Sequence, residues 1–168
     1  MAKLIKARQA AQDNWQLLKA AEDGTLALPA SGAVIVPLAT WKAQRDVLLA
    51  RGDVGVLLEP NEEPGELEGD VAALPLIAIN FPSFQDGRGY STARLLRERF
   101  GFRGELRAVG DVLLDELFYM SRVGFDAFVL RDDQDLDACL KVFDTFSEAY
   151  QVSVERPVPL FRRRLANA

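Results

Sequence analysis

From residue 33 onward, short runs of β-branched residues alternate with longer segments in which apolar residues recur every three or four positions. This alternation is typical of strands that pair in parallel, because a helix between two strands carries the chain back across the sheet. It predicts an α/β domain of about five parallel βα units over residues 33–150. The expected strands are Val34–Pro37, Val54–Leu58, Leu76–Phe81, Glu105–Val109 and Asp126–Leu130, and the expected helices are Thr40–Ala50, Gly65–Ala73, Ser91–Phe100, Asp111–Val123 and Leu136–Tyr150.

Two architectures accommodate five such units. A closed eight-unit barrel needs about 250 residues, and this chain has 168. We therefore expect an open, doubly wound sheet of the flavodoxin-like or Rossmann-like kind, with a partial (β/α) barrel as the alternative. Arg107, in the middle of an expected strand, favours the alternative, because a charge buried between two helix layers is costly unless it is paired.

The two ends of the chain differ in character from the domain between them. Residues 1–32 are expected to form an N-terminal extension, either a hairpin or a short helix within Leu4–Leu18. Residues 151–168 are expected to form an extended basic tail, because Pro157 and Pro159 interrupt any helix. Inside the domain, Glu59–Asp70 holds six acidic and no basic residues, so most of it is expected to be an exposed loop.

Composition removes several classes of function. The chain has no histidine and one cysteine, Cys139, so Ser-His-Asp and Cys-His nucleophiles, imidazole metal sites, iron–sulfur clusters and dithiol pairs are excluded. Cys139 is expected to be a small buried side chain. A net charge of −5 argues against nucleic acid as a partner. The longest apolar stretch, Val71–Ile79, is too short to span a bilayer, and a cytoplasmic location is expected.

The loop after the third expected strand has the features of an anion cradle. Ligands of parallel sheets gather at the carboxyl ends of the strands. Here two glycines permit close approach to the backbone, Ser91 can cap the following helix, and the positive end of the helix dipole favours an anion. Neither GxGxxG nor GxxxxGK[ST] is present, so no nucleotide motif supports the cradle.

Charge also gathers in this part of the chain. Residues 81–110 hold six arginines and three acidic residues, and guanidinium groups bind oxyanions and carboxylates in a bidentate manner. If the third and fourth strands are neighbours, Arg88 and Arg107 reach the same edge, and Asp86 is expected to orient Arg88. Arg94, Arg97 and Arg99 can equally form a solvated helix face. The expected ligand-binding residues are Asp86, Gly87, Arg88, Gly89, Tyr90, Ser91, Arg94, Arg97, Arg107, Gly110 and Asp111.

No catalytic group is specified by the sequence. Asp115, Tyr90 and Tyr119 are the candidates for proton transfer near the cradle. Such tyrosines more often pack in or beside a core with a hydrogen-bonded hydroxyl. Catalytic residues and cofactors are therefore left unassigned.

Five runs of sequence resemble one known family. They are Val34–Leu38, Phe81–Ser91, Ala93–Arg97, Glu105–Leu113 and Gly124–Phe128. The chain resembles, over about residues 30–130, the bacterial family catalogued as domain of unknown function 934, with Ser83 and Gln85 as mild departures from its pattern. The resemblance implies an association with assimilatory sulfite reductase and phosphoadenylyl-sulfate reductase. It also carries the label of an oxidoreductase, which is the sole indication of an enzyme.

Three functions follow as expectations. The first is an accessory protein of sulfite reduction that binds a sulfur oxyanion or a reductase partner through the arginine-rich site. The second is an oxidoreductase that uses a borrowed flavin or nicotinamide, although no dinucleotide fingerprint is present. The third is a structural domain that forms a homodimer, in which the arginines only make ion pairs.

Overall fold

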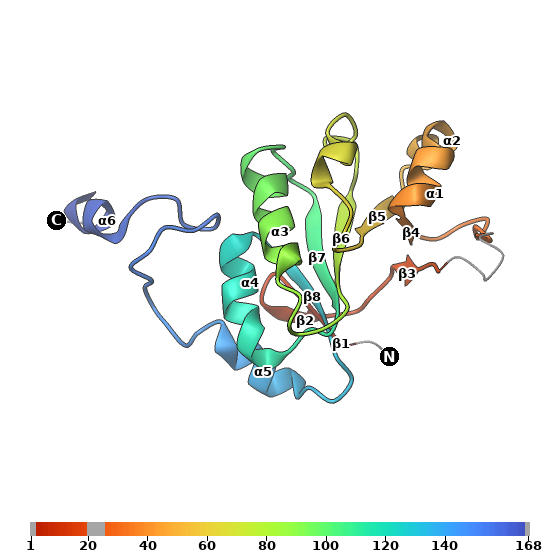
Figure 1. Ribbon diagram of the computed structural model, residues 1–168. Coiled ribbons are helices and arrows are strands. Elements are labelled where there is room, and N and C mark those ends of the chain that lie inside the picture. The colour runs from red at the N-terminus through yellow and green to blue at the C-terminus, as the bar shows by residue number, and fades with distance from the viewer. Residues whose placement is uncertain (1–2, 20–25, 167–168) are drawn as a thin grey trace.

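A single sheet of eight strands forms the centre of the computed structural model, which describes residues 3–19 and 26–166 (Figure 1). The strands are β1 (Lys3–Lys6), β2 (Gln9–Ala11), β3 (Gln16–Leu17), β4 (Val34–Pro37), β5 (Val54–Leu58), β6 (Leu76–Phe81), β7 (Glu105–Gly110) and β8 (Ala127–Leu130). The helices are α1 (Leu38–Ala43), α2 (Arg45–Arg51), α3 (Arg88–Glu98), α4 (Leu117–Val123), α5 (Leu136–Val142) and α6 (Leu160–Ala166), with 3-10 turns η1 (Pro64–Leu67) and η2 (Leu114–Glu116).

The strand order explains why the sheet is not of the flavodoxin-like kind. The order is β2-β1-β8-β7-β6-β5-β4-β3, and the run from β3 to β8 is consecutive and parallel. A doubly wound sheet reverses direction part-way and has helices on both faces. Because each crossover here moves one strand in the same direction, right-handed connections put every helix on one face. The α/β class with a mostly parallel sheet is confirmed, whereas five regular βα units and the flavodoxin-like sheet are not.

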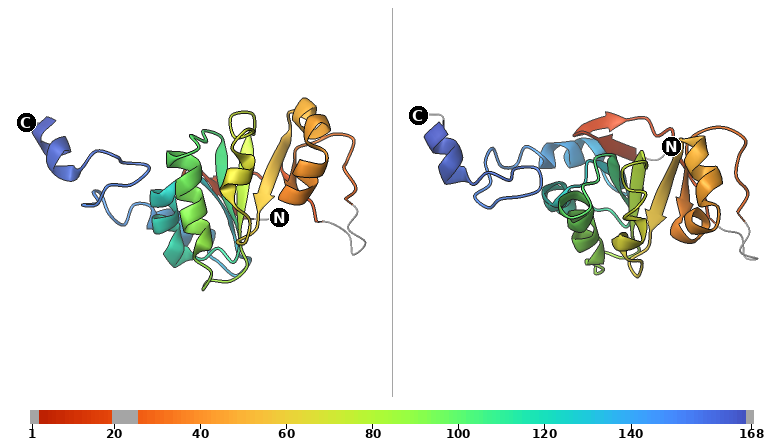
Figure 2. Two further views of the ribbon diagram at one scale, coloured as in Figure 1. Left: turned by 45° about the horizontal axis from the view of Figure 1, so that its top comes forward. Right: turned by 90° about the horizontal axis from the view of Figure 1, so that it is seen from above.

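Side-chain alternation divides the sheet into two faces. Residues such as Val56, Ile79 and Ala108 share the main core with apolar residues of α1 to α5. On the opposite face a smaller cluster of Ile35, Leu57, Leu76, Ala78 and Val109 meets no helix. Figure 2 shows the helices α1 to α4 on one side of the sheet. Cys139 is fully buried in the main core.

The face without helices is crossed by the chain itself. Residues 12–15, here called the strap, connect β2 at one edge of the sheet to β3 at the other (Figure 1). Eight flat strands would put the two edges about 34 Å apart, but Ala11 to Gln16 can span only about 17 Å. The sheet must therefore curl around the strap, and Trp15 packs into the concave side. The result is a half-barrel, which agrees with the expected alternative of a partial barrel.

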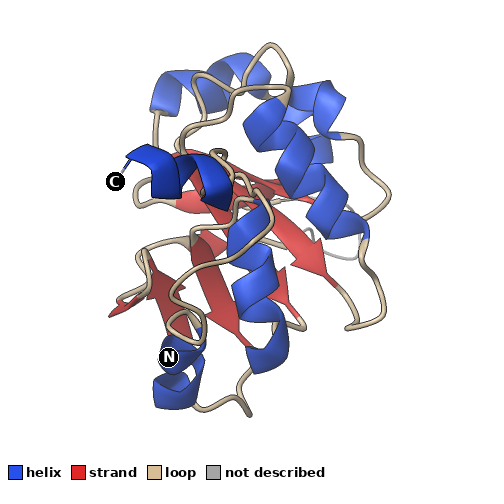
Figure 3. Cartoon of the chain, turned by 90° about the vertical axis from the view of Figure 1, so that its left-hand side faces the viewer, coloured by secondary structure: helices blue, strands red, loops and turns tan. Residues whose placement is uncertain are grey.

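Several elements differ from the expected ones. The expected helix Thr40–Ala50 is broken at Gln44, and the 3-10 turn η1 with further turns replaces Gly65–Ala73. Of the two forms expected for the N-terminal extension, residues 3–11 adopt an antiparallel hairpin and not a helix. The tail is extended as far as Pro159 and then ends in α6, which projects away from the sheet (Figure 1), so that α6 lies in front of the sheet when seen from that side (Figure 3). Within the described ranges, no helix has the length and apolar character needed to cross a bilayer.

Candidate functional site

The predicted cradle is occupied by the protein's own carboxylate. Asp86 accepts hydrogen bonds from the backbone N–H of Arg88 at 3.3 Å and from its guanidinium at 2.9 and 2.6 Å. Asp86 thus orients Arg88, as expected, and Arg88 holds the pKa of that carboxyl below its usual range. An external anion at the start of α3 would have to displace Asp86. Gly89 serves packing, since a Cβ there would lie 2.6 Å from the ring of Phe81.

Gly110 and Asp111 close the neighbouring loop. The carboxylate of Asp111 accepts a hydrogen bond from the N–H of Phe84 at 2.9 Å and pairs with Arg131 at 2.6 Å. It therefore ties the loops after β6, β7 and β8 together, and no helix begins at this residue. Arg131 carries no sequence signal for this role, because it lies 20 residues further along the chain.

The structure does not bring Arg107 to the cradle. β6 and β7 are indeed neighbours, but Arg107 lies on the concave face with Glu105, whereas α3 packs on the opposite face. The guanidinium is 2% exposed and pairs with Asp13 of the strap at 2.9 Å and with Glu105 at 2.6 Å. Lys6 completes the network by pairing with Glu105 at 2.7 Å. The four charges sum to zero. Because Asp13 belongs to the strap and Arg107 to β7, their ion pair holds the strap against the sheet.

The candidates for proton transfer lie beside α4. The hydroxyl of Tyr90 donates to Glu116 at 2.7 Å, and burial raises the pKa of both groups. Tyr119 stacks against Tyr90 at 5.3 Å between ring centroids, and Asp115 is exposed. A tyrosine whose pKa is raised holds its proton more firmly, so this arrangement serves packing better than proton release.

The other residues of the predicted site divide between α3's surface and a separate pocket. Arg94 is exposed and pairs with Glu98 at 2.9 Å, as a solvated helix face would, and Gly87 and Ser91 are exposed nearby. Arg97, in contrast, points toward the amino ends of β7 and β8. It lines a cavity of about 370 Å³ between the β1–β2 hairpin, α3, α4 and residues 154–155.

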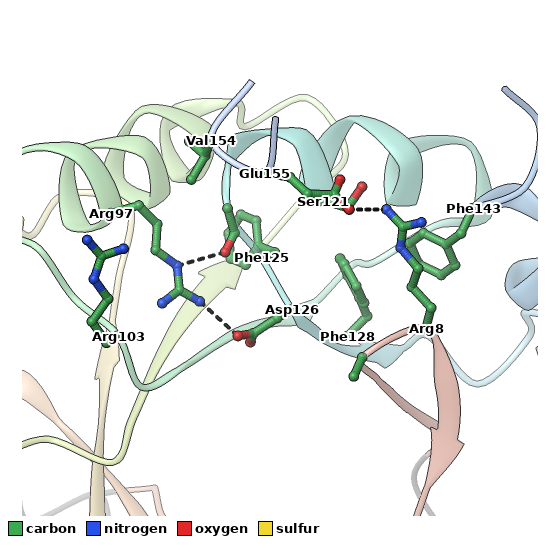
Figure 4. Close-up of a pocket in the computed structure, with 12 residues that line it drawn as sticks. Arg8, Arg97, Arg103, Ser121, Phe125, Asp126, Phe128, Phe143, Val154 and Glu155 are labelled. Carbon is green, nitrogen blue, oxygen red and sulfur yellow. Dashed lines mark hydrogen bonds and ion pairs between the residues drawn. The ribbon is translucent and has the colours of Figure 1, made fainter. Parts of the chain in front are cut away.

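Three arginines line this cavity, which we call the arginine pocket (Figure 4). Arg8 comes from the β1–β2 turn, Arg97 from α3 and Arg103 from the loop before β7. The sequence placed Arg97 and Arg103 in its basic segment. It gave no signal for Arg8, which is distant along the chain and is brought in by the hairpin. The remaining lining includes Phe125, Phe128, Phe143, Asp126 and Glu155.

Of the three arginines of the pocket, Arg97 is the one whose guanidinium is engaged in hydrogen bonds that stabilise the fold. It donates to the carbonyl oxygens of Gly124, Phe102 and Gly104, each at 2.9 Å, and to Asp126 at 2.9 Å. Burial lowers the pKa of the Arg97 guanidinium, and burial raises the pKa of the Asp126 carboxyl. Arg97 therefore joins the end of α3 to the loops that precede β7 and β8, and it adds charge to the pocket wall.

Arg8 and Arg103 are the more available members. Arg8 has a positive φ of 64°, as has Ala7 beside it at 48°, so both occupy a turn conformation that glycine or asparagine usually adopts. Its guanidinium pairs with Glu155 and lies 5.8 Å from the ring centroid of Phe143. Arg103 is exposed and forms no hydrogen bond or ion pair with any residue in the described part of the chain.

The chemistry of the arginine pocket suits an anion attached to an apolar or aromatic body. Its three guanidinium groups face two carboxylates, so one positive charge is left over in a protein whose net charge is −5. Phenylalanine rings form the apolar part of the wall. A cavity of this size falls in the range of organic ligands and exceeds what a bare oxyanion needs. Across the described ranges, no group of three His, Cys, Asp or Glu residues is arranged to hold a metal ion.

Comparison with known families gives one match. A family model described as "Bacterial protein of unknown function (DUF934)" matches residues 55–161. The chain belongs to the DUF934 family. No curated protein matches it.

The DUF934 match covers β5 to β8, the cradle and most of the arginine pocket. Arg97, Arg103 and the three phenylalanines lie inside the matched range. Arg8 and the strap lie outside it. The matched range thus contains most of the pocket wall of this chain, and the N-terminal hairpin adds the third arginine.

Proposed function

We propose that this DUF934 protein is a non-catalytic binding protein for an anionic ligand, and that the arginine pocket is the binding site. The observation that carries the proposal is Arg103, a guanidinium without a protein partner among the described residues, beside the already paired Arg97. An arginine in this setting is free to form a bidentate pair with a sulfate, phosphate or carboxylate group.

The apolar wall narrows the class of ligand. Phe125, Phe128 and Phe143 line the pocket with at most 3% of each residue exposed, so they offer apolar contact at the wall, and Arg8 already lies against one of these rings. An oxyanion on a planar organic body would place its charge at Arg103 and its body against the rings. A free sulfate or sulfite ion would use the charge alone and bind more weakly.

The family resemblance supplies the pathway of this proposal. It implies an association with assimilatory sulfite reductase and phosphoadenylyl-sulfate reductase. Within that association we propose an accessory role, in which sulfur oxyanions are the ligands and one of these reductases is the partner. Phosphoadenylyl sulfate, after which the second reductase is named, is a sulfate carried on a nucleotide. It therefore combines an oxyanion with a planar organic body, the two features that suit the arginine pocket. We therefore propose sulfur oxyanions, free or on a nucleotide, as the ligands.

Titration calorimetry tests the proposal with sulfite, sulfate and adenylyl sulfate as probes. We expect adenylyl sulfate to bind more tightly than the two free ions, and more tightly at low salt. Arg103→Ala should weaken binding by about tenfold to 150-fold, the effect of losing one charge-assisted hydrogen-bonding group. The free energy of unfolding should stay unchanged, because the Arg103 side chain is exposed and pairs with no residue in the described part of the chain.

Arg99→Ala is the matched control, because Arg99 is also exposed and lies four residues away, outside the pocket. It should leave the affinity as it is. Absence of binding by all three probes would reject the proposal, as would equal losses in the two variants. Visible flavin absorption in the purified protein would favour the oxidoreductase alternative instead.

A further inference from the structure

A second cavity lies at the opposite ends of the strands, on the concave face. It measures about 370 Å³ and lies at the carboxyl ends of β4 to β7, where the chain leaves β3. We call it the carboxyl-edge cavity, lined by Lys19, Leu57, Glu59, Asn80, Val109 and Gly110 among others. In curled parallel sheets this edge is where loops gather around ligands. It shares no residue with the arginine pocket.

The polar groups of the cavity are fixed in place by the sheet. The amide of Asn80, next to the end of β6, donates to Glu59 at 2.7 Å. Gly110, in the adjacent strand, has a φ of 97°, and a Cβ there would lie 2.6 Å from Oδ1 of Asn80. Glycine is required at this position by the positive φ and by the backbone oxygen of Phe81, and its missing Cβ also leaves room for the Asn80 amide. The backbone N–H of Glu59 is in turn held by Glu62 at 2.7 Å.

Three charged or polar functions of the cavity are left without partners among the described residues. Glu59 forms no ion pair, and its second carboxylate oxygen accepts no hydrogen bond. Oδ1 of Asn80 accepts none either. Lys19, on the segment that closes the cavity, pairs with no acidic residue of the described chain. Apolar side chains, Leu57 and Val109 among them, separate these groups.

This arrangement is complementary to a small molecule with two opposite charges. We propose that the carboxyl-edge cavity binds a zwitterion of the amino-acid type. The ligand's carboxylate pairs with Lys19, its ammonium donates to Glu59 and to Oδ1 of Asn80, and its side chain lies against Leu57 and Val109. A ligand with one charge pairs with either Lys19 or Glu59 alone, whereas a zwitterion pairs with both.

The test uses L-leucine together with two analogues of the same shape. One is 4-methylpentanoate, which lacks the ammonium, and the other is isopentylamine, which lacks the carboxylate. Calorimetry should show that leucine binds at least tenfold more tightly than either analogue. Nuclear magnetic resonance of the labelled protein should show leucine-dependent shifts at the Gly110 N–H and the Asn80 side-chain amide. No shift is expected at the arginine pocket.

Substitutions locate the binding. Glu59→Gln and Lys19→Met should each weaken leucine binding tenfold or more. Glu68→Gln on the same acidic loop and Lys141→Met on α5 make the same charge changes at exposed positions and should leave binding unchanged. If a substitution at the cavity unfolds the protein, the leucine-dependent shift of the Gly110 N–H in the unaltered chain still shows whether leucine binds at the carboxyl-edge cavity.

The proposal is overturned if leucine produces no shift at Gly110, if an analogue binds as tightly as leucine, or if the control substitutions weaken binding as much as Glu59→Gln. Arg103→Ala should leave leucine binding as it is. Absence of anion binding at the arginine pocket would therefore reject the proposed function, but it would not affect the proposal that the carboxyl-edge cavity binds a zwitterion.

Discussion

Arg107 shows what a buried charge does when the sheet around it is curled. Its guanidinium is among the largest fully buried side chains of the described chain, and its partners come from three places: Glu105 in its own strand, Asp13 in the strap and, through Glu105, Lys6 in β1. Asp13 also accepts a hydrogen bond from the N–H of Trp15 at 3.0 Å. The network therefore gives the strap a defined position, which apolar contacts alone would not.

Substitution of Arg107 tests this role. Arg107→Met removes one partner of a buried network and leaves Glu105 and Asp13 facing each other, so the free energy of unfolding should fall by about 3–5 kcal/mol. Urea denaturation measures the change. Arg94→Met, which removes an exposed helix-surface pair, should have little effect. A loss no larger than that of the control would show that the network contributes nothing to folding, and anion binding by the folded variant should be unchanged.

The strap is the element that makes the concave face an interior. Trp15 is half-buried against the small cluster of Ile35, Leu57 and their neighbours, which no helix covers. Without it, the apolar side of the sheet would face water. The strap thus covers apolar side chains on the concave face of the sheet, and the helices α1 to α5 cover those on the other face.

Trp15→Ala should lower the free energy of unfolding by about 2–3 kcal/mol, less than the cost of removing a fully buried aromatic ring. It should also expose the cluster beneath, which binding of a hydrophobic dye would detect. Gln12→Ala, at an exposed position of the same strap, is the control. A stable Trp15→Ala variant that binds no dye would mean that the strap does not shield this face.

Sequence patterns predicted the elements unevenly. The five expected strands correspond to β4 to β8 within one residue at each end, because β-branched runs bounded by glycine and proline are local signals. The strand order and the strap are not local: residues 12–15 carry no periodicity, and their place depends on two distant sheet edges. Only Arg107, a charge within a strand, indicated a curled sheet.

The candidate site divides in the same way. Arg97 was among the expected ligand-binding residues, although it was expected at the cradle, and Arg103 was counted in the basic segment but was not assigned to a site. Arg8, Phe143 and Glu155 could not be predicted, since only the β1–β2 hairpin and the return of the chain after α5 bring them to the arginine pocket. Asp86 was expected to orient Arg88, and its carboxylate accepts hydrogen bonds from that guanidinium and from one backbone N–H at the start of α3.

At the scale of the whole molecule, the C-terminal segment stands apart. α6 carries Arg162, Arg163 and Arg164 and exposes Phe161 by 59%, and it lies away from the sheet (Figures 1 and 2). Among the described residues, the ion pairs of residues 156–166 run from Arg156 and Arg163 to Glu148. The segment therefore contributes little to the core and presents a basic, partly apolar surface.

Deletion of residues 156–168 should leave the free energy of unfolding within about 1 kcal/mol of the full chain, because surface ion pairs contribute little. It spares Val154 and Glu155, so ligand binding at the arginine pocket should persist. Binding to sulfite reductase, the partner that the resemblance implies, should weaken at low salt and change less at high salt. A large loss of stability, or a reductase affinity that is unaltered at low salt, would contradict this role for the tail.

The antiparallel pairing of β1 with β8 has a consequence for how the protein is made. β1 is synthesised before every other described element, yet its partner is the last strand of the sheet. Within the described sheet, β1 can therefore pair with β2 alone until β8, which ends at residue 130, has been synthesised. Contacts this distant along the chain slow folding, because a long loop must close before they form. In a nascent chain that ends before β8, β1 lacks the second of its two pairing strands. The described sheet can therefore be completed only after β8 has been synthesised.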